Sequence, residues 1–153
     1  MESAIVGALK GVRGRTVDTV YDLFFTDKRM IAAILTHPSD FNDIYAKINL
    51  TNLVFGNSTK LRAVKMRSLD LIESRRSAFT NKTADEILAL HRSNLEIDYE
   101  NIIHVTVKKG LLTKSLEFAV QNPPGKKVSF SLEENQIAET EELLKKVLPG
   151  KTK

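Results

Sequence analysis

The stretch Tyr21–Leu35, YDLFFTDKRMIAAIL, decides the fold that this sequence predicts. Two apolar runs meet at four polar residues, Thr26-Asp27-Lys28-Arg29, which can turn a chain. We therefore expect a β-hairpin whose first strand covers 16–26 and whose second covers Arg29–Leu35. The second strand is apolar almost throughout, which is typical of a strand covered on both faces.

The residues before the hairpin predict one more strand and a basic turn. The pattern over 3–10 favours a strand, and the two glycines within Lys10–Arg15, KGVRGR, mark a turn toward the next strand. Lys10, Arg13 and Arg15 would then lie together in the loop between strands one and two.

The residues after the hairpin, 36–94, change to a helical pattern. His37-Pro38 ends the preceding strand because proline has no amide hydrogen for a sheet. A short amphipathic helix is expected to begin at Ser39 or Asp40, and Thr83-Ala84-Asp85-Glu86 is a capping-box pattern for a later helix. We expect three helices in this insert, over about 39–48, 60–79 and 83–92.

From Leu95 the alternation typical of strands returns. A short strand over 95–98 and a bend over 99–101 lead into a three-stranded meander, over about 103–107, 116–120 and 128–132. An amphipathic helix over about 133–148 follows and ends at Pro149-Gly150. The sequence therefore predicts one α+β domain over 1–150. It is a seven-stranded antiparallel barrel or sandwich with a C-terminal helix and a helical insert between strands three and four.

The composition limits the class of protein. The 153 residues contain no cysteine, which excludes disulfides, a thiol nucleophile and zinc sites that use cysteine. The first residues, MESAIVGALKGVRG, do not have the form of a secretory signal. No stretch approaches the roughly 20 apolar residues of a membrane span. We therefore expect a cytoplasmic protein without a transmembrane segment.

The positive charge of the chain is concentrated in one segment. The formal net charge is +4, whereas residues 60–82 alone carry seven basic and two acidic residues. A packed helix with a solvated basic face accounts for this pattern. If this face binds a partner, we expect an acidic protein or a second copy rather than nucleic acid, because the basic helix has no aromatic residue for base stacking before Phe79. The residues of the predicted interaction surface are Lys60, Arg62, Lys65, Arg67 and Arg76.

Two segments resemble prokaryotic members of the pleckstrin-homology-like (PH-like) family. Leu23–Ala32, LFFTDKRMIA, is similar to their strand-turn-strand hairpin. Leu95–Val105, LEIDYENIIHV, is similar to their short strand, tyrosine bend and next strand. The meander and the final helix fit the same plan, whereas 36–94 departs from it, since the family joins these strands by a short turn. The resemblance implies a binding module for lipid headgroups or protein segments and implies no catalytic residue.

Lys10, Arg13 and Arg15 occupy the place where lipid-binding members of this family carry basic residues, and their spacing resembles the phosphoinositide pattern. Guanidinium groups bind phosphate oxygens through paired hydrogen bonds. The resemblance therefore implies an anionic headgroup or an acidic partner at these residues. Three solvated charges on an ordinary turn are the alternative.

Other residues that could carry function are two leucines and the histidines. Leu111 and Leu112 lie at a predicted hairpin tip among lysines, and we expect one or both to fold back onto the core. Insertion of this tip into a bilayer interface is the alternative. His37, His91 and His104 lack the spacing of a metal site, and no catalytic motif or phosphate loop occurs. The sequence thus predicts no metal and no cofactor.

These patterns predict a non-enzymatic cytoplasmic binding module that acts through protein contacts, with self-association through the insert as one form of contact. A peripheral binder of anionic lipid, acting through the loop between strands one and two, is the alternative. A nucleic-acid binder that uses the basic helix ranks third.

Overall fold

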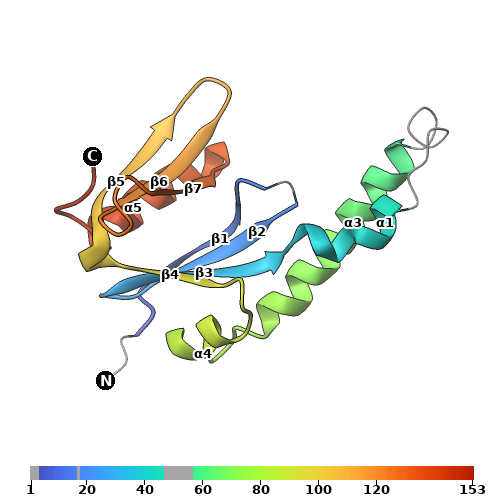
Figure 1. The fold of residues 1–153 in the computed structure, drawn as a ribbon, viewed down its shortest axis with the longest axis horizontal. Helices are drawn as coiled ribbons and strands as arrows, with labels where there is room; N and C mark the ends of the chain where they lie inside the picture. Colours follow the sequence, from blue (N-terminus) through green and yellow to red (C-terminus); the bar gives the residue numbers. More distant parts are fainter. Residues whose placement is uncertain (1–3, 17, 47–56) are drawn as a thin grey trace.

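An antiparallel sheet of seven strands forms the centre of the computed structural model, which describes residues 4–16, 18–46 and 57–153. The strands are β1 (Gly7–Arg13), β2 (Val20–Phe25), β3 (Arg29–Thr36), β4 (Leu95–Asp98), β5 (Ile102–Lys109), β6 (Lys114–Val120) and β7 (Lys127–Ser131). Their order is β4-β3-β2-β1-β7-β6-β5, and paired neighbours are antiparallel. Figure 1 shows that β5–β7 turn away from β1–β4, so the two parts of the sheet enclose a shared core.

Helices follow β3 and β7. Those of the insert are the 3-10 helix η1 (Pro38–Phe41) and the α-helices α1 (Asn42–Ala46), α3 (Asn57–Ser77) and α4 (Ala84–Ala89). The 3-10 helix η2 (Tyr99–Asn101) joins β4 to β5, and η3 (Glu134–Gln136) leads into the C-terminal α5 (Ile137–Val147). The predicted α+β class, the helical insert and the C-terminal helix are therefore confirmed. None of the described helices is long and apolar enough to cross a membrane.

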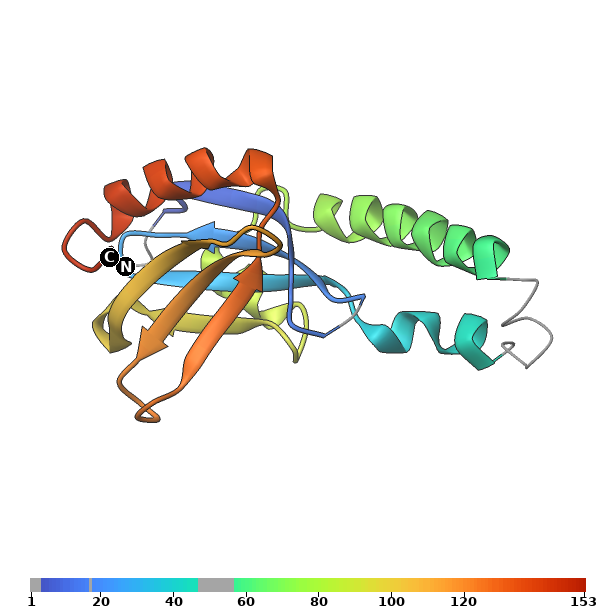
Figure 2. The same cartoon turned by 90° about the horizontal axis from the view of Figure 1, so that it is seen from above.

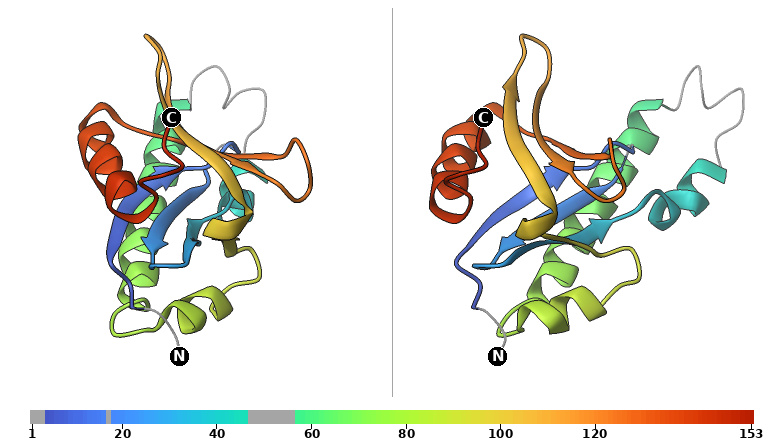
Figure 3. Two further views of the ribbon diagram at one scale, coloured as in Figure 1. Left: turned by 90° about the vertical axis from the view of Figure 1, so that its left-hand side faces the viewer. Right: turned by 60° about the vertical axis from the view of Figure 1, so that its left-hand side comes forward.

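Apolar side chains cover both faces of β3. Met30 and Ala32 point into the core that is shared with β5–β7 and α5. Ile31 and Leu35 point the other way, into a second cluster that includes Ile87 of α4. Successive residues alternate between the two clusters because the side chains of a strand point to opposite faces. The predicted burial of this strand on both faces is confirmed, and the views in Figure 3 show the helices of the insert beside the sheet.

The first two strands differ from the prediction. β1 runs through Gly7–Arg13 rather than 3–10, and residues 1–3 lie outside the described part. The register between β1 and β2 shifts between Leu9 and Val12, and Gly11 has a φ of +70°, so a bulge replaces the predicted turn. Glycine adopts this conformation without steric cost. Lys10 and Arg13 therefore lie on a strand, only Arg15 lies in the following loop, and β2 begins at Val20 rather than at 16.

Most helix boundaries differ from the prediction by a few residues. His37, not Ser39 or Asp40, caps the first turn, and its ring accepts a hydrogen bond from the Ser39 amide. The Thr83 capping box is confirmed. The long helix begins at Asn57, and the last helix begins with the 3-10 turn η3 rather than directly at 133. The proposed helical positions at 47–48 lie outside the described residues.

A buried ion pair fixes α3 on the sheet. Asp22 of β2 is fully buried, and Arg76 donates to both oxygens of its carboxylate, from Nε at 2.7 Å and from Nη2 at 2.8 Å. The Gly11 amide donates a third hydrogen bond to Asp22 at 2.8 Å. These bonds to Asp22 raise the pKa of Arg76. A buried carboxylate is costly unless it is paired in this way, so the last turns of α3 must lie over β1 and β2.

Replacing Arg76 by methionine should lower the free energy of unfolding by about 3 kcal/mol, because the Asp22 carboxylate stays buried without its cation. Urea denaturation measures this loss. The double variant Asp22→Asn/Arg76→Met should recover part of it, since no charge is then left buried. The matched control is Arg62→Met, which changes an exposed arginine of the same helix and should cost less than about 0.5 kcal/mol. Equal losses in Arg76→Met and Arg62→Met would contradict this role.

Candidate functional site

β4 is an edge strand, and half of its backbone hydrogen-bonding groups point away from β3. Just beyond the strand, the Tyr99 amide donates to the Lys28 carbonyl at 2.9 Å. Antiparallel pairs alternate between bonded and non-bonded residues, so Ile97 also faces β3, whereas Glu96 and Asp98 face outward. Within the described part of the chain, no other strand pairs with the outward groups of Glu96 or with the outward amide of Asp98, whereas the Asp98 carbonyl accepts the first hydrogen bond of η2.

A groove of about 570 Å³ opens beside this free edge. Leu95 and Ile97 of β4 form one apolar wall, and Val120 and Val128 of β6 and β7 form the other. The volume lies within the range of ordinary ligand-binding sites. Polar residues surround the apolar part: Glu96, Asp98, Glu100, Asn101, Gln121, Asn122 and Lys126.

Hydrogen bonds hold the η2 end of the groove in place. The buried Tyr99 hydroxyl donates to the Thr26 carbonyl at 2.7 Å, which ties η2 to the β2–β3 turn. Burial is the main cause that raises the pKa of Tyr99. The Asn101 side chain accepts a hydrogen bond from the Asn122 amide at 3.0 Å and donates one to the Asn122 carbonyl at 3.1 Å. These contacts within the chain hold the wall of the groove in place, which lowers the entropy cost of binding.

The start of β4 is fixed from β3 and α4. The Ile34 amide donates to the Asn94 side chain at 2.7 Å, and the same side chain donates to the Ile87 carbonyl at 2.9 Å. Arg29 binds Glu96 of β4 at 2.7 Å and also pairs with Asp85. The hydrogen bond to Asp85 is the largest cause that raises the pKa of Arg29. These contacts hold β4 against β3 and leave its other edge open.

The opposite edge of the sheet differs from β4 because the C-terminal residues cover part of it. The Val105 amide of β5 donates to the Lys151 carbonyl at 2.9 Å, and the Lys153 amide donates to the Val105 carbonyl at 3.0 Å. Lys151 also extends its ammonium group to the Tyr99 carbonyl at 2.5 Å. Of the two sheet edges, β4 is the one that offers unpaired groups beside a groove.

A second and smaller pocket, of about 280 Å³, lies at the β1–β2 loop. Arg13 and Arg15 line it, whereas Lys10 does not and is exposed on β1. Thr19 also lines it, and its Oγ1 is buried without a hydrogen-bond partner among the described residues. No described residue of the insert lines this pocket, so the helices leave it open.

The basic residues predicted as an interaction surface have different environments. Arg76 binds Asp22, and Arg67 binds Asp43 and the Asp40 carbonyl, so both are used within the chain. Arg62 and Lys65 are exposed, and the side chain of Lys60 lies outside the described part. Binding of an acidic partner to Arg62 and Lys65 stays a prediction. Two apolar residues of α3 are also exposed and available to a self-associating insert: Met66 and Leu69.

The prediction that Leu111 or Leu112 folds back onto the core is wrong. Their exposed fractions are 101% and 97%, because the β5–β6 hairpin projects away from the sheet. The lysines around them are paired with carboxylates: Lys108 with Glu117, Lys109 with Glu141 and Lys114 with Glu134. The hairpin is therefore apolar at its tip and balanced in charge around it, which gives it little attraction for an anionic surface.

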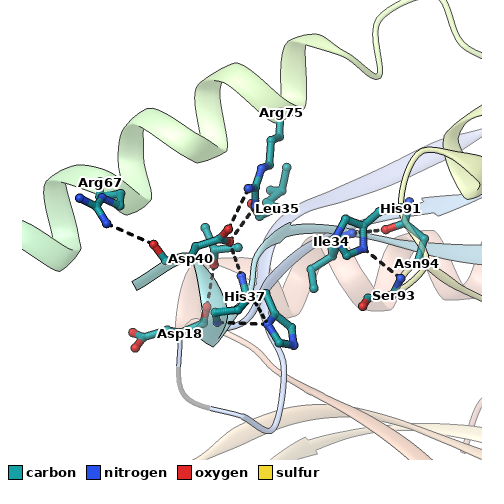
Figure 4. Close-up of polar contacts among 12 residues, drawn as sticks. Asp18, Ile34, Leu35, His37, Asp40, Arg67, Arg75, His91, Ser93 and Asn94 are labelled. Carbon is teal, nitrogen blue, oxygen red and sulfur yellow. Dashed lines mark hydrogen bonds and ion pairs between the residues drawn. The ribbon is translucent and has the colours of Figure 1, made fainter. Parts of the chain in front are cut away.

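The histidines form local backbone contacts. Nδ1 of His37 accepts from the Ser39 amide at 3.2 Å, and Nδ1 of His91 accepts from the Ser93 amide at 2.9 Å (Figure 4). Among the described residues, no group of three or more histidine or acidic side chains could hold a metal ion. The absence of a cofactor and of catalytic activity stays a prediction.

No family model, no curated protein and no solved structure matches this chain. The resemblance to the PH-like family therefore stays a prediction. Sequence reasoning did not single out the groove beside β4. The sequence feature that points to this groove is the alternation of apolar and acidic residues over Leu95–Asp98. Which strand lies at an edge, however, depends on the order of the whole sheet.

Asp40 links the helices α1 and α3 to the end of β3. Arg75 donates two hydrogen bonds to the Asp40 carboxylate, at 2.8 and 2.9 Å, and one to the Leu35 carbonyl at 2.7 Å (Figure 4). The His37 amide also donates to Asp40, at 2.8 Å. The bonds from Arg75, followed by that from His37, hold the pKa of Asp40 below its usual value. Figure 2 shows α1 and the first part of α3 extending beyond the sheet, so this cluster anchors them.

Because its pKa is lowered on folding, Asp40 should stabilise the protein above the unfolded-state pKa of about 3.9 and lose this effect as the pH falls through the folded-state pKa. Arg75→Met should therefore flatten the fall in the free energy of unfolding between about pH 5 and 2, by on the order of 1 kcal/mol. Urea denaturation at several pH values measures this difference. Asp40→Asn, which removes the titrating group, should also flatten the curve. An unchanged pH profile in both variants would refute this assignment.

Proposed function

We propose that this chain is a non-enzymatic binding module of PH-like architecture that acts through protein contacts, and that it binds an extended protein segment as an added strand beside β4. One observation carries the proposal: the free edge of β4 borders a groove that has apolar residues on both walls and a polar surround. Strand addition of this kind gains affinity from backbone hydrogen bonds and specificity from pockets for alternate side chains.

The geometry supplies both parts of such a site. Glu96 presents an outward amide and carbonyl and Asp98 an outward amide, which an extended backbone can pair. Leu95, Ile97 and Val128 lie where the inward side chains of an added strand would pack. An unprotected strand edge is a template for pairing with another chain, and soluble proteins usually cover or shorten such edges. A segment bound here would pair groups that are otherwise left to water.

The outward amide of Asp98 can be removed without disturbing the pairing of β4 with β3. The φ of Asp98 is −68°, which proline also adopts, and Ile97 before it lies in a strand, as proline requires. Asp98→Pro should weaken binding about tenfold relative to Asp98→Ala, since only the proline removes the N–H. Suitable probes are peptides selected from a random displayed library against the unaltered protein. Fluorescence anisotropy of each peptide measures the affinities.

Asp98→Ala is the matched control because it removes the same carboxylate and keeps the amide. Amide chemical shifts of the bound protein should change at β4 and at Val120 and Val128. Peptides that bind Asp98→Pro and Asp98→Ala equally, or that leave the β4 amides unshifted, would show that strand addition is not the mode of binding.

A second candidate function is the binding of an anionic headgroup at the β1–β2 loop. The observation that favours it is the pocket that Arg13 and Arg15 line together with Thr19, whose buried Oγ1 lacks a partner among the described residues. Phosphate oxygens could accept hydrogen bonds from both guanidinium groups. Lys10, the third basic residue of the predicted pattern, does not line this pocket.

Under this second function, Arg13→Ala/Arg15→Ala should weaken binding to vesicles that contain anionic phospholipid at least tenfold, since each basic residue near the surface contributes about 1 kcal/mol. Sedimentation with vesicles at low salt measures the bound fraction. Arg62→Ala/Lys65→Ala is the matched control, because it removes the same charge from exposed positions on α3. An equal loss in the control, or no binding of the unaltered protein to anionic vesicles, would exclude a specific headgroup site.

A further inference from the structure

We infer that the segment bound beside β4 alternates apolar and basic residues. This inference rests on the proposed function and adds the chemistry of the partner to it. It follows from the two faces of β4, from the charges around the groove and from the pairing that a second copy of this chain would form.

The two faces of β4 impose the alternation. Leu95 and Ile97 point toward the inner core, and Glu96 and Asp98 are exposed on the other face. Side chains of an added strand lie beside those of its neighbour, about 5 Å away, on the same face. Residues of the segment opposite Ile97 would therefore enter the groove toward Val120 and Val128, while the residues between them would lie beside carboxylates.

The charges around the groove favour a cation at those outer positions. Three acidic residues and one basic residue lie along the groove, Glu96, Asp98, Glu100 and Lys126, although the chain as a whole has a net charge of +4. Arg29 forms an ion pair with Glu96 at 2.7 Å and so compensates the charge of that carboxylate. No ion pair involves Asp98 or Glu100 within the described part of the chain. Lysine or arginine on the segment would pair with these two carboxylates.

A second copy of this chain is a poor occupant. Antiparallel pairing of two β4 strands about Ile97 would place Glu96 of one copy directly opposite Asp98 of the other, twice. Like charges at directly opposed positions destabilise a strand pair. The same repulsion acts against an acidic segment and against nucleic acid. The edge therefore discriminates among partners by charge as well as by shape.

Three short synthetic peptides test the inference: one alternates valine and lysine, one alternates valine and glutamate, and one has the composition of the first with its lysines grouped in one block. Glycine and proline at the ends of each peptide keep it from associating with itself. We expect the valine-lysine peptide to bind at least tenfold more tightly than either of the others and to shift the β4 amides. Its affinity should fall as salt is added.

The variant Asp98→Lys/Glu100→Lys should reverse the preference, so that the valine-glutamate peptide binds more tightly. Both positions are exposed, and the salt dependence of the unaltered protein provides the same information if the variant does not fold. Equal or tighter binding of the valine-glutamate or the blocked peptide to the unaltered protein would overturn the alternation while leaving strand addition intact. Absence of β4 amide shifts with all three peptides and with the selected library peptides would overturn strand addition itself.

Discussion

The buried carboxylate of Asp22 ties together three segments that are distant in sequence. It accepts hydrogen bonds from Arg76 in the insert and from the Gly11 amide in β1, and it lies on β2. Because an unpaired buried charge is costly, each partner must be in place when the fold forms. The bulge in β1 follows from the same constraint, since the conformation of Gly11 turns its amide out of the ladder and toward Asp22.

The position of β4 follows from how the insert lies on the sheet. The chain leaves the sheet after Thr36 and returns at Leu95, and the helices between these points cover the outer face of β3. Asn94 then joins Ile34 to Ile87, and Arg29 joins β4 to α4. The insert therefore occupies a face of the sheet and not its edge. This difference leaves β4 with one partner strand and an open groove on its other side.

The two candidate sites have opposite charge. Arg13 and Arg15 line the pocket at the β1–β2 loop, whereas three acidic residues and one basic residue lie along the groove beside β4. A net charge of +4 gives no sign of this separation. The basic excess of the insert contributes little to either site, since Arg67, Arg75 and Arg76 are bound to carboxylates of the chain itself. The charge that the sequence concentrates in one helix serves in large part to attach that helix.

The sequence by itself determined the hairpin of Tyr21–Leu35, the meander, the insert and the final helix, because alternation, turn residues and caps are local signals that short segments carry. It did not determine the burial of Asp22, since its partner Arg76 lies 54 residues away. The alternation of Leu95–Asp98 was visible, but an unpaired edge is a property of strand order, and strand order arises only when distant segments pack. The exposed Leu111 and Leu112 were misjudged for the same reason: whether a hairpin tip meets a core depends on where the sheet ends.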